Sequence, residues 1–193
     1  MTGVQTCALP ILFGTQKDAD VPRRSRHVHD IRRAFHSQMK RLWLQHPTLS
    51  GIAIQSPDIV SRISLEDFTW LPLVTESNGL ICKLDILMLR AGPPGRVIAD
   101  IDNRLKTIFD ALRMARTPEE LGSRTPEGQL KPLTDETPFF VLLENDHLIT
   151  HVSVTTDTIL EPVPPVPEEN AVRLVIGVTV RPYHAHTDNL DYV

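Results

Sequence analysis

The sequence lacks the features that mark several broad classes of protein. Aromatic residues make up only 5% of its 193 residues, and the two cysteines, Cys7 and Cys82, form no Cys-X-X-Cys or Cys/His pattern. No stretch approaches the roughly 20 apolar residues that cross a bilayer, and the first residues lack the basic region of a secretory signal. We therefore expect neither a cysteine-based metal site nor a membrane span, and we predict a cytoplasmic protein.

The composition that is present is that of a globular domain. Hydrophobic residues make up 41% of the chain and charged residues 23%, and this length fits a single domain with a real core. The net charge of −4 is unevenly distributed, because residues 12–46 hold eight Lys and Arg against three Asp, a net charge of +5, which leaves −9 elsewhere. Such a split fits a phosphate-contacting segment beside an acidic metal site.

The first eleven residues stand apart from the rest. Residues 1–11 (MTGVQTCALPI) carry no charge and no clear periodicity, and they look like the in-frame translation of a common sequencing adapter. We therefore expect this segment to be an artefact that takes no part in the fold. The predicted domain spans residues 12–182, with its N-terminal strand truncated, and residues 183–193 are predicted to form a flexible tail.

Apolar periodicity predicts an α+β domain in which helices pack on one mixed β-sheet. Residues 28–45 carry apolar side chains at three- and four-residue steps, which indicates an amphipathic helix, and residues 102–114 predict a second one. The expected core stripe of that second helix is Ile101, Leu105, Ile108, Phe109 and Leu112. Strands are predicted over residues 68–74, 80–90, 139–143, 148–156 and 171–181.

The connections also carry signals. Asn78-Gly79 between the first two strands predicts an antiparallel hairpin. Residues 48–67 favour a loop with at most a short helix, and residues 115–138 favour a long exposed loop. Residues 161–169 contain four prolines and are typical of a polyproline-like spacer.

The segment from Asp100 to Lys106 is the most informative part of the chain. Asp100 and Asp102 place two carboxylates where a strand or loop turns into a helix, and Lys106 follows one helical turn later. Asn103 and Asp110 fall on the same arc of the helix. Mg²⁺ takes carboxylate oxygens, water and phosphate oxygens, and a nearby lysine can stabilise charge on a phosphate. The alternatives are that an aspartate caps the helix or that Lys106 pairs with its neighbours.

A second acidic cluster follows the predicted strand at residues 139–143. Glu144, Asn145 and Asp146 lie where acidic side chains at a strand end could complete a metal site, although an ordinary solvated turn has the same composition. Two His-X-His pairs, His27/His29 and His184/His186, are poor candidates for metal ligands, because one lies on a basic arm and the other in the predicted tail.

Basic residues of the first helix suggest contacts with a nucleic-acid backbone. The residues that we expect to bind DNA are Arg32, Arg33, Lys40 and Arg41, together with Arg104. Such contacts would position DNA without reading its sequence. The alternative is a solvated helix face with no partner.

Taken together, these motifs resemble the RusA family of Holliday-junction resolvases. The resemblance is carried by Asp100-Ile101-Asp102-Asn103-Arg104-Leu105-Lys106, then Phe109-Asp110-Ala111-Leu112, then Glu144-Asn145-Asp146, within about residues 80–160. It implies a homodimeric, prokaryotic or phage endonuclease that cuts four-way DNA junctions with Mg²⁺, or with Mn²⁺ in its place. By position, Asp100, Asp102 and Asp146 would bind the metal, and Lys106 would be the catalytic lysine.

Two departures from the family pattern keep an alternative open. The family usually has two adjacent aspartates where this chain has Asn145-Asp146, and the loop before that cluster is longer than expected. The alternative is a catalytically inactive RusA-like protein that binds DNA or serves in assembly. A purely structural domain, in which every acid caps or pairs, is a more remote alternative.

Overall fold

The computed structural model describes residues 4–12, 21–55, 60–90, 101–122, 128–160 and 171–185, together with residues 187 and 189. The elements, in order, are β1 (Val4–Leu12), α1 (Val21–Gln45), α2 (Pro47–Gln55), β2 (Ile63–Leu65), β3 (Phe68–Val74), β4 (Leu80–Arg90), α3 (Ile101–Leu112), the 3₁₀ helix η1 (Pro118–Leu121), β5 (Phe139–Leu143), the 3₁₀ helix η2 (Asp146–Leu148), β6 (Ile149–Thr158) and β7 (Ala171–Pro182). This set of helices and strands confirms the predicted α+β class. Among the described helices, none is long and apolar enough to span a membrane.

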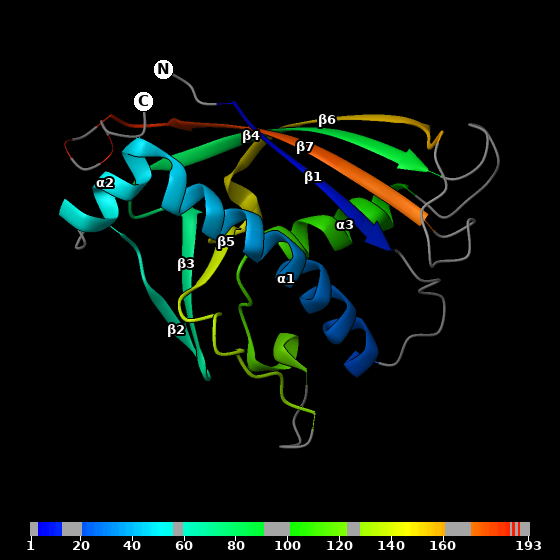
Figure 1. Cartoon of the computed structure of the whole chain (residues 1–193), viewed down its shortest axis with the longest axis horizontal. Helices are drawn as coiled ribbons and strands as arrows, with labels where there is room; N and C mark the ends of the chain where they lie inside the picture. The colour runs from blue at the N-terminus through cyan, green and yellow to red at the C-terminus, as the bar shows by residue number, and fades with distance from the viewer. Residues whose placement is uncertain are drawn as a thin grey trace.

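The described strands form two mixed sheets, whereas the sequence predicted one. The larger sheet has the order β1-β7-β4-β6, in which only the β4–β6 pair is parallel, and the smaller has the order β2-β3-β5, in which β3 and β5 are parallel. Figure 1 shows α1 and α3 on one side of the larger sheet, and α1 also runs across the smaller sheet, since His29 lies beside Phe139 and Trp43 lies beside Phe140. Apolar side chains of α1 and α3 share one hydrophobic core with strands of both sheets.

The helix predicted over residues 28–45 is confirmed as the core-facing part of α1, which begins earlier, at Val21. Its apolar stripe is buried, and Trp43 is only 3% exposed. Residues 47–55 form the helix α2, the short helix that the prediction for residues 48–67 allowed, and Pro47 begins it. Proline suits the first turn of a helix, where a backbone N–H has no partner within the helix.

Both strands around Asn78-Gly79 have the predicted bounds, but the predicted hairpin is wrong. β3 pairs with β2 and β5, whereas β4 pairs with β6 and β7. The turn between them is wide: the N–H of Leu80 donates to the carbonyl of Thr75 at 3.1 Å, and Gly79 has a φ of 60°. Gly79 supplies the left-handed conformation that the motif signals. β3 is buried on both of its faces, whereas β4 alternates between buried and exposed residues.

The helix α3 is buried on a somewhat different face from the predicted one. Its buried residues are Arg104, Thr107, Ile108, Ala111 and Leu112, while Leu105 and Phe109 are partly buried against the core. Ile101 is 44% exposed, because the helix begins there, at its outer end. The long methylene stem of an arginine can lie against apolar neighbours, which allows Arg104 to replace an apolar residue in the buried face.

Several segments that we expected to lie outside the fold contact it. Residues 4–12 form β1, an edge strand that pairs with residues 171–179 of β7. In the predicted tail, the buried Asn189 side chain donates to the carbonyl of Asn78 at 2.9 Å. The predicted exposed loop contains the buried Leu121 and Glu136. The predicted spacer at residues 161–169 lies outside the described residues.

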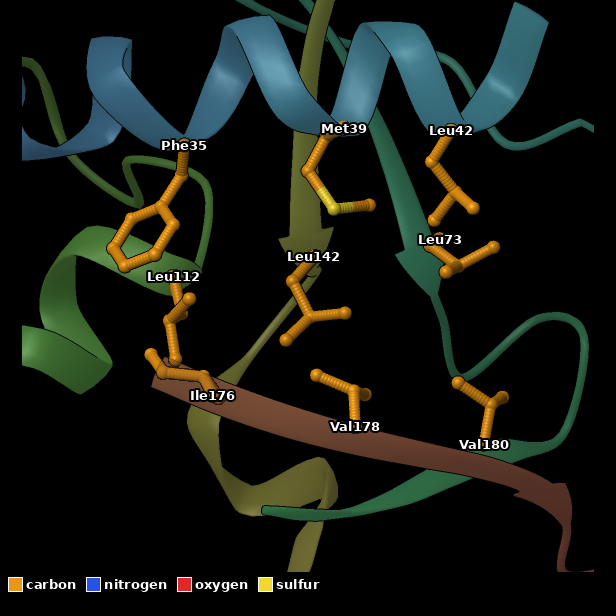
Figure 2. Close-up of a pocket in the computed structure, with 9 residues that line it drawn as sticks. All are labelled: Phe35, Met39, Leu42, Leu73, Leu112, Leu142, Ile176, Val178 and Val180. Atoms are coloured by element: carbon orange, nitrogen blue, oxygen red, sulfur yellow. The ribbon is translucent and has the colours of Figure 1, made fainter. Parts of the chain in front are cut away.

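The core between α1 and the larger sheet is not completely filled. Figure 2 shows side chains of α1 and β7 facing one another across a cavity of about 30 Å³. Its lining is wholly apolar: Phe35, Met39, Leu42, Leu73, Leu112, Leu142, Ile176, Val178 and Val180. Because no polar atom lines it, a water molecule would find no hydrogen-bond partner there. The cavity is therefore a gap in packing and offers no polar recognition of a ligand.

Candidate functional site

The start of α3 presents the polar residues of the predicted site to solvent. Asp102, Asn103 and Lys106 are all exposed, and Asp102 and Lys106 lie one turn apart on the same side of the helix. The backbone N–H of Asn103 donates to Oδ1 of Asp102 at 2.7 Å. A carboxylate in the first turn is stabilised by the helix dipole. Asp100 lies outside the described residues.

The second acidic cluster lies beside the turn between β3 and β4. Glu144 is turned toward that turn, because its Oε2 accepts a hydrogen bond from the backbone N–H of Glu76 at 2.9 Å. His147 pairs with the Glu76 carboxylate at 2.8 Å. Asp146 is exposed in the first turn of η2, and η2 contacts both α3 and β4. The fold thus brings the element that carries Asp146 against the helix that carries Asp102.

Asn145 does not point outward as Asp146 does. It precedes η2 with a φ of −146°, and its Oδ1 is buried, with no hydrogen-bond partner among the described residues. Its side chain therefore lies partly inside the protein, where an ionised carboxylate would be costly to bury.

A metal site built from described residues alone is incomplete. Within the part of the chain that the structure describes, no three His, Cys, Asp or Glu side chains form a group that could hold a metal ion. Asp102 and Asp146 have the oxygen ligands and the exposure that Mg²⁺ requires. The donor chemistry therefore fits the metal, with Asp100, the third predicted ligand, outside the described residues.

Asp110 belongs to a structural ion-pair network. Its Oδ1 accepts from Arg113 at 2.8 Å and its Oδ2 lies 3.6 Å from Arg24, while Arg113 also binds Glu120 at 2.9 Å. Burial alone would lower the pKa of Arg113, but the hydrogen bonds and charges of Glu120 and Asp110 raise it above its ordinary value. This network joins α1, α3 and η1.

Two of the residues predicted to contact DNA are buried. Arg32 is 0% exposed, and it donates to the carbonyls of Asp110 at 2.7 Å and Arg113 at 2.9 Å, at the C-terminal end of α3. Its guanidinium also lies 5.4 Å from the centre of the Trp70 ring. Arg104 is 7% exposed. The prediction of DNA contacts is therefore wrong for Arg32 and Arg104.

The other predicted basic contacts differ in what holds them. Arg33 pairs with the buried Glu136 at 2.8 Å, and Lys40 donates to the carbonyl of Asp135 at 2.6 Å. Arg41 is exposed. The structure adds Arg24 and Arg26 to the exposed basic residues of α1. The sequence could have distinguished the buried Arg32 from the exposed basic residues, because Arg32 lies four residues after Val28 and three before Phe35. This spacing places it on the core face of the helix.

A buried cluster of histidine and aromatic side chains was not predicted. His29 lies between Phe68 and Phe139, with ring centres 5.3 and 5.5 Å away, and His36 lies 4.4 Å from Phe139. Nδ1 of His36 accepts a hydrogen bond from the N–H of Phe140 at 2.8 Å. Burial, assisted by the charges of Arg32 and Arg33, lowers the pKa of His29 to about 3.

This cluster predicts that the protein loses stability in mild acid. The unfolded chain binds a proton at His29 below the ordinary pKa of 6.5, and the folded chain does so only near pH 3. The free energy of unfolding should therefore fall as the pH drops below 6.5, by up to about 1.4 kcal/mol per pH unit from this residue. Urea unfolding at pH 7.5, 6.0 and 5.0 measures the slope. The His29→Phe variant should show a shallower slope, and an equal slope in both proteins would contradict the assignment.

The motifs of this site are not accompanied by a wider match to known proteins. Comparison of the chain with models of protein families, with curated proteins and with solved structures finds no match.

Proposed function

We propose that this chain is a Mg²⁺-dependent endonuclease that cuts four-way or otherwise branched DNA, of the RusA type. The observation that carries the proposal is the exposed pair of Asp102 and Lys106, one turn apart at the start of α3, beside an element that carries the exposed Asp146. A carboxylate, a lysine and a second carboxylate on neighbouring elements are the groups that metal-assisted phosphodiester hydrolysis needs.

The residues of the site have distinct roles in this proposal. Asp102 and Asp146 would hold the metal ion together with Asp100, and when bound, Mg²⁺ neutralises phosphate charge and lowers the pKa of a water molecule. The ammonium of Lys106 can donate hydrogen bonds to a phosphate oxygen, because its three N–H groups are exposed at one end of a flexible stem. Asn103 is an exposed accessory, whereas Asp110 maintains the ion-pair network.

The exposed basic residues of α1 would bind the DNA backbone. Arg24 lies close to α3, since it approaches Asp110, and Arg41 lies 17 residues further along the helix, or about 25 Å at 1.5 Å per residue. Arg24, Arg26 and Arg41 replace Arg32 and Arg104 in this role, with Lys40 and Arg33 partly engaged within the protein. Contacts of this kind are independent of base sequence and weaken with salt.

A synthetic four-way junction tests the proposal directly. We expect paired nicks in the labelled junction with Mg²⁺, no product with chelator, and at most slow cleavage of a linear duplex of the same sequence. Measurement of product against time at several Mg²⁺ concentrations separates catalysis from binding. Absence of cleavage with either Mg²⁺ or Mn²⁺, at protein concentrations that saturate the junction, would contradict the proposal.

The second candidate is a non-cleaving DNA-binding or assembly protein with the same fold. Asn145 favours it, because this neutral side chain, with a buried Oδ1, stands where the RusA pattern has an acid. It predicts salt-sensitive junction binding without a metal-dependent product.

A further inference from the structure

Among the described strands, β6 is the last strand of the larger sheet on the side away from β1. Within the described part of the chain, β6 pairs with β4 alone, through a parallel ladder that extends from Ile149 to Thr158. A strand edge of this kind carries a row of backbone N–H and C=O groups that can pair with another strand. Figure 1 shows β6 as the outermost strand on the side of the sheet away from β1.

The sequence of β6 favours pairing and contains little that prevents it. Seven of its ten residues (ITHVSVTTDT) are β-branched, and it has no Lys, Arg or Pro. Proteins usually protect long edges with lysine, proline or a bulge, or keep them short. The opposite edge of the sheet follows that rule, because β1 contains Pro10. β6 has one register shift against β4, between Ile149 and His151, but from His151 to Thr158 its ladder is regular and contains no lysine or proline.

We propose that two copies of this chain associate through β6, as antiparallel strands related by a two-fold axis at Val154. The larger sheets of the two copies then form one continuous sheet. Pairing over residues 151–157 would form about six to eight backbone hydrogen bonds between the two edges. Val152, which is 37% exposed in the single chain, would be covered by Thr156 of the second copy.

The register follows from charge complementarity and from the alternation of side chains. The outer face of β6 carries His151, Ser153, Thr155 and Asp157, since these residues pair with the outer-face residues of β4 that begin with Lys83 and Asp85. The helices of both copies lie on the same side of the joined sheet only if the two-fold axis is perpendicular to the sheet. Such an axis places one residue of β6 directly opposite the same residue of the second copy. An axis at Val154 places His151 opposite Asp157 of the second copy, twice.

The neighbouring registers lack this pairing. An axis at Ser153 would place Asp157 opposite Ile149, and an axis at Thr155 would place Asp157 opposite Ser153. Side chains directly opposite each other in an antiparallel ladder are close enough for an imidazole N–H to donate to a carboxylate. The proposal adds a surface to the homodimer that the family resemblance implies, but its test measures association and does not depend on cleavage.

Charge reversal at the edge tests the pairing. We expect the full chain to sediment as a dimer at concentrations near 50 µM. Asp157→Lys places a lysine opposite His151, and His151→Asp places a carboxylate opposite Asp157, so each should weaken the dimer at least about tenfold. The double variant restores an opposite-charge pair and should return the dimer affinity to within about threefold of the wild-type value. Asp85→Lys, on the same face but in the interior strand β4, is the matched control and should leave association unchanged.

Cysteine cross-linking tests the register. In a Cys7→Ser background, Val154→Cys places two thiols opposite each other across the axis and should give a disulfide-linked dimer on mild oxidation. Thr156→Cys is the control, because the two copies of residue 156 would lie four residues apart along the ladder, or about 13 Å, too far for a disulfide. Burial raises the pKa of Cys82 to about 12, which keeps that thiol unreactive. A monomeric protein, or a dimer unaffected by Asp157→Lys and not linked at residue 154, would overturn the proposal.

Discussion

Replacement of Asp102 by asparagine should reduce Mg²⁺-dependent cleavage of a four-way junction by at least about 100-fold, which is the scale of losing one charged group from a preorganised site. The fold should survive, because an asparagine side chain can still accept the hydrogen bond that Asp102 Oδ1 accepts from the N–H of Asn103. Asp102 is exposed, so the change leaves no cavity. Junction affinity in chelator should remain within a few-fold of the wild-type value.

This variant separates the catalytic interpretation from helix capping. If Asp102 only caps α3, the asparagine variant should cut DNA as the wild-type chain does, because asparagine and aspartate are about equally good at the N-terminus of a helix. Asp85→Asn, an exposed carboxylate on the outer face of the larger sheet, is the control and should retain full activity. Cleavage is best measured as single-turnover product formation with protein in excess, together with binding to the same labelled junction.

The second large effect is expected on stability. Replacement of Arg32 by leucine should lower the free energy of unfolding by about 2–4 kcal/mol, because the carbonyls of Asp110 and Arg113 would lose their donor inside the protein. Burial lowers the pKa of Arg32 to about 10, so that the side chain is still charged at neutral pH. It acts as a cap for the C-terminal end of α3, where a positive charge also complements the helix dipole.

Arg41→Ala is the matched comparison, because Arg41 belongs to the same helix but is exposed. Its free energy of unfolding should stay within about 0.5 kcal/mol of the wild-type value. Its DNA affinity should fall, with the slope of log K against log salt reduced by about one. Urea unfolding and salt titration of junction binding measure the two effects. A stable Arg32→Leu protein with weakened DNA binding would contradict the assignment of Arg32 to the core.

Much of the secondary structure could be predicted because it depends on neighbouring residues. The strands at residues 68–74, 80–90 and 139–143 have the predicted bounds, since each is rich in apolar residues and is followed by turn residues. The core stripe of α1 was visible in the spacing of Val28 and Phe35. For the site, the helical phase alone put Asp102 and Lys106 on one side of α3, and the structure shows both exposed.

Other features could not be predicted, for an equally physical reason. The hairpin motif Asn78-Gly79 correctly marked a turn with positive φ, but it held no information on which strands pair beyond it. The acids at residues 144–146 gave no sign that Glu144 would be held by the N–H of Glu76, 68 residues away, or that Asn145 would turn inward. Such contacts depend on how complete elements pack.

Residue type and local spacing were enough to predict the α+β class, the helical and strand periods, and the chemical groups at Asp100, Asp102, Lys106 and Asp146. The three-dimensional packing was needed to show that the described strands divide into two sheets and that β6 lies at the end of one of them. It also decided that Arg32 is buried against carbonyls 78 and 81 residues away. Long-range pairing and desolvation arise from contacts between distant segments, and local patterns do not encode them.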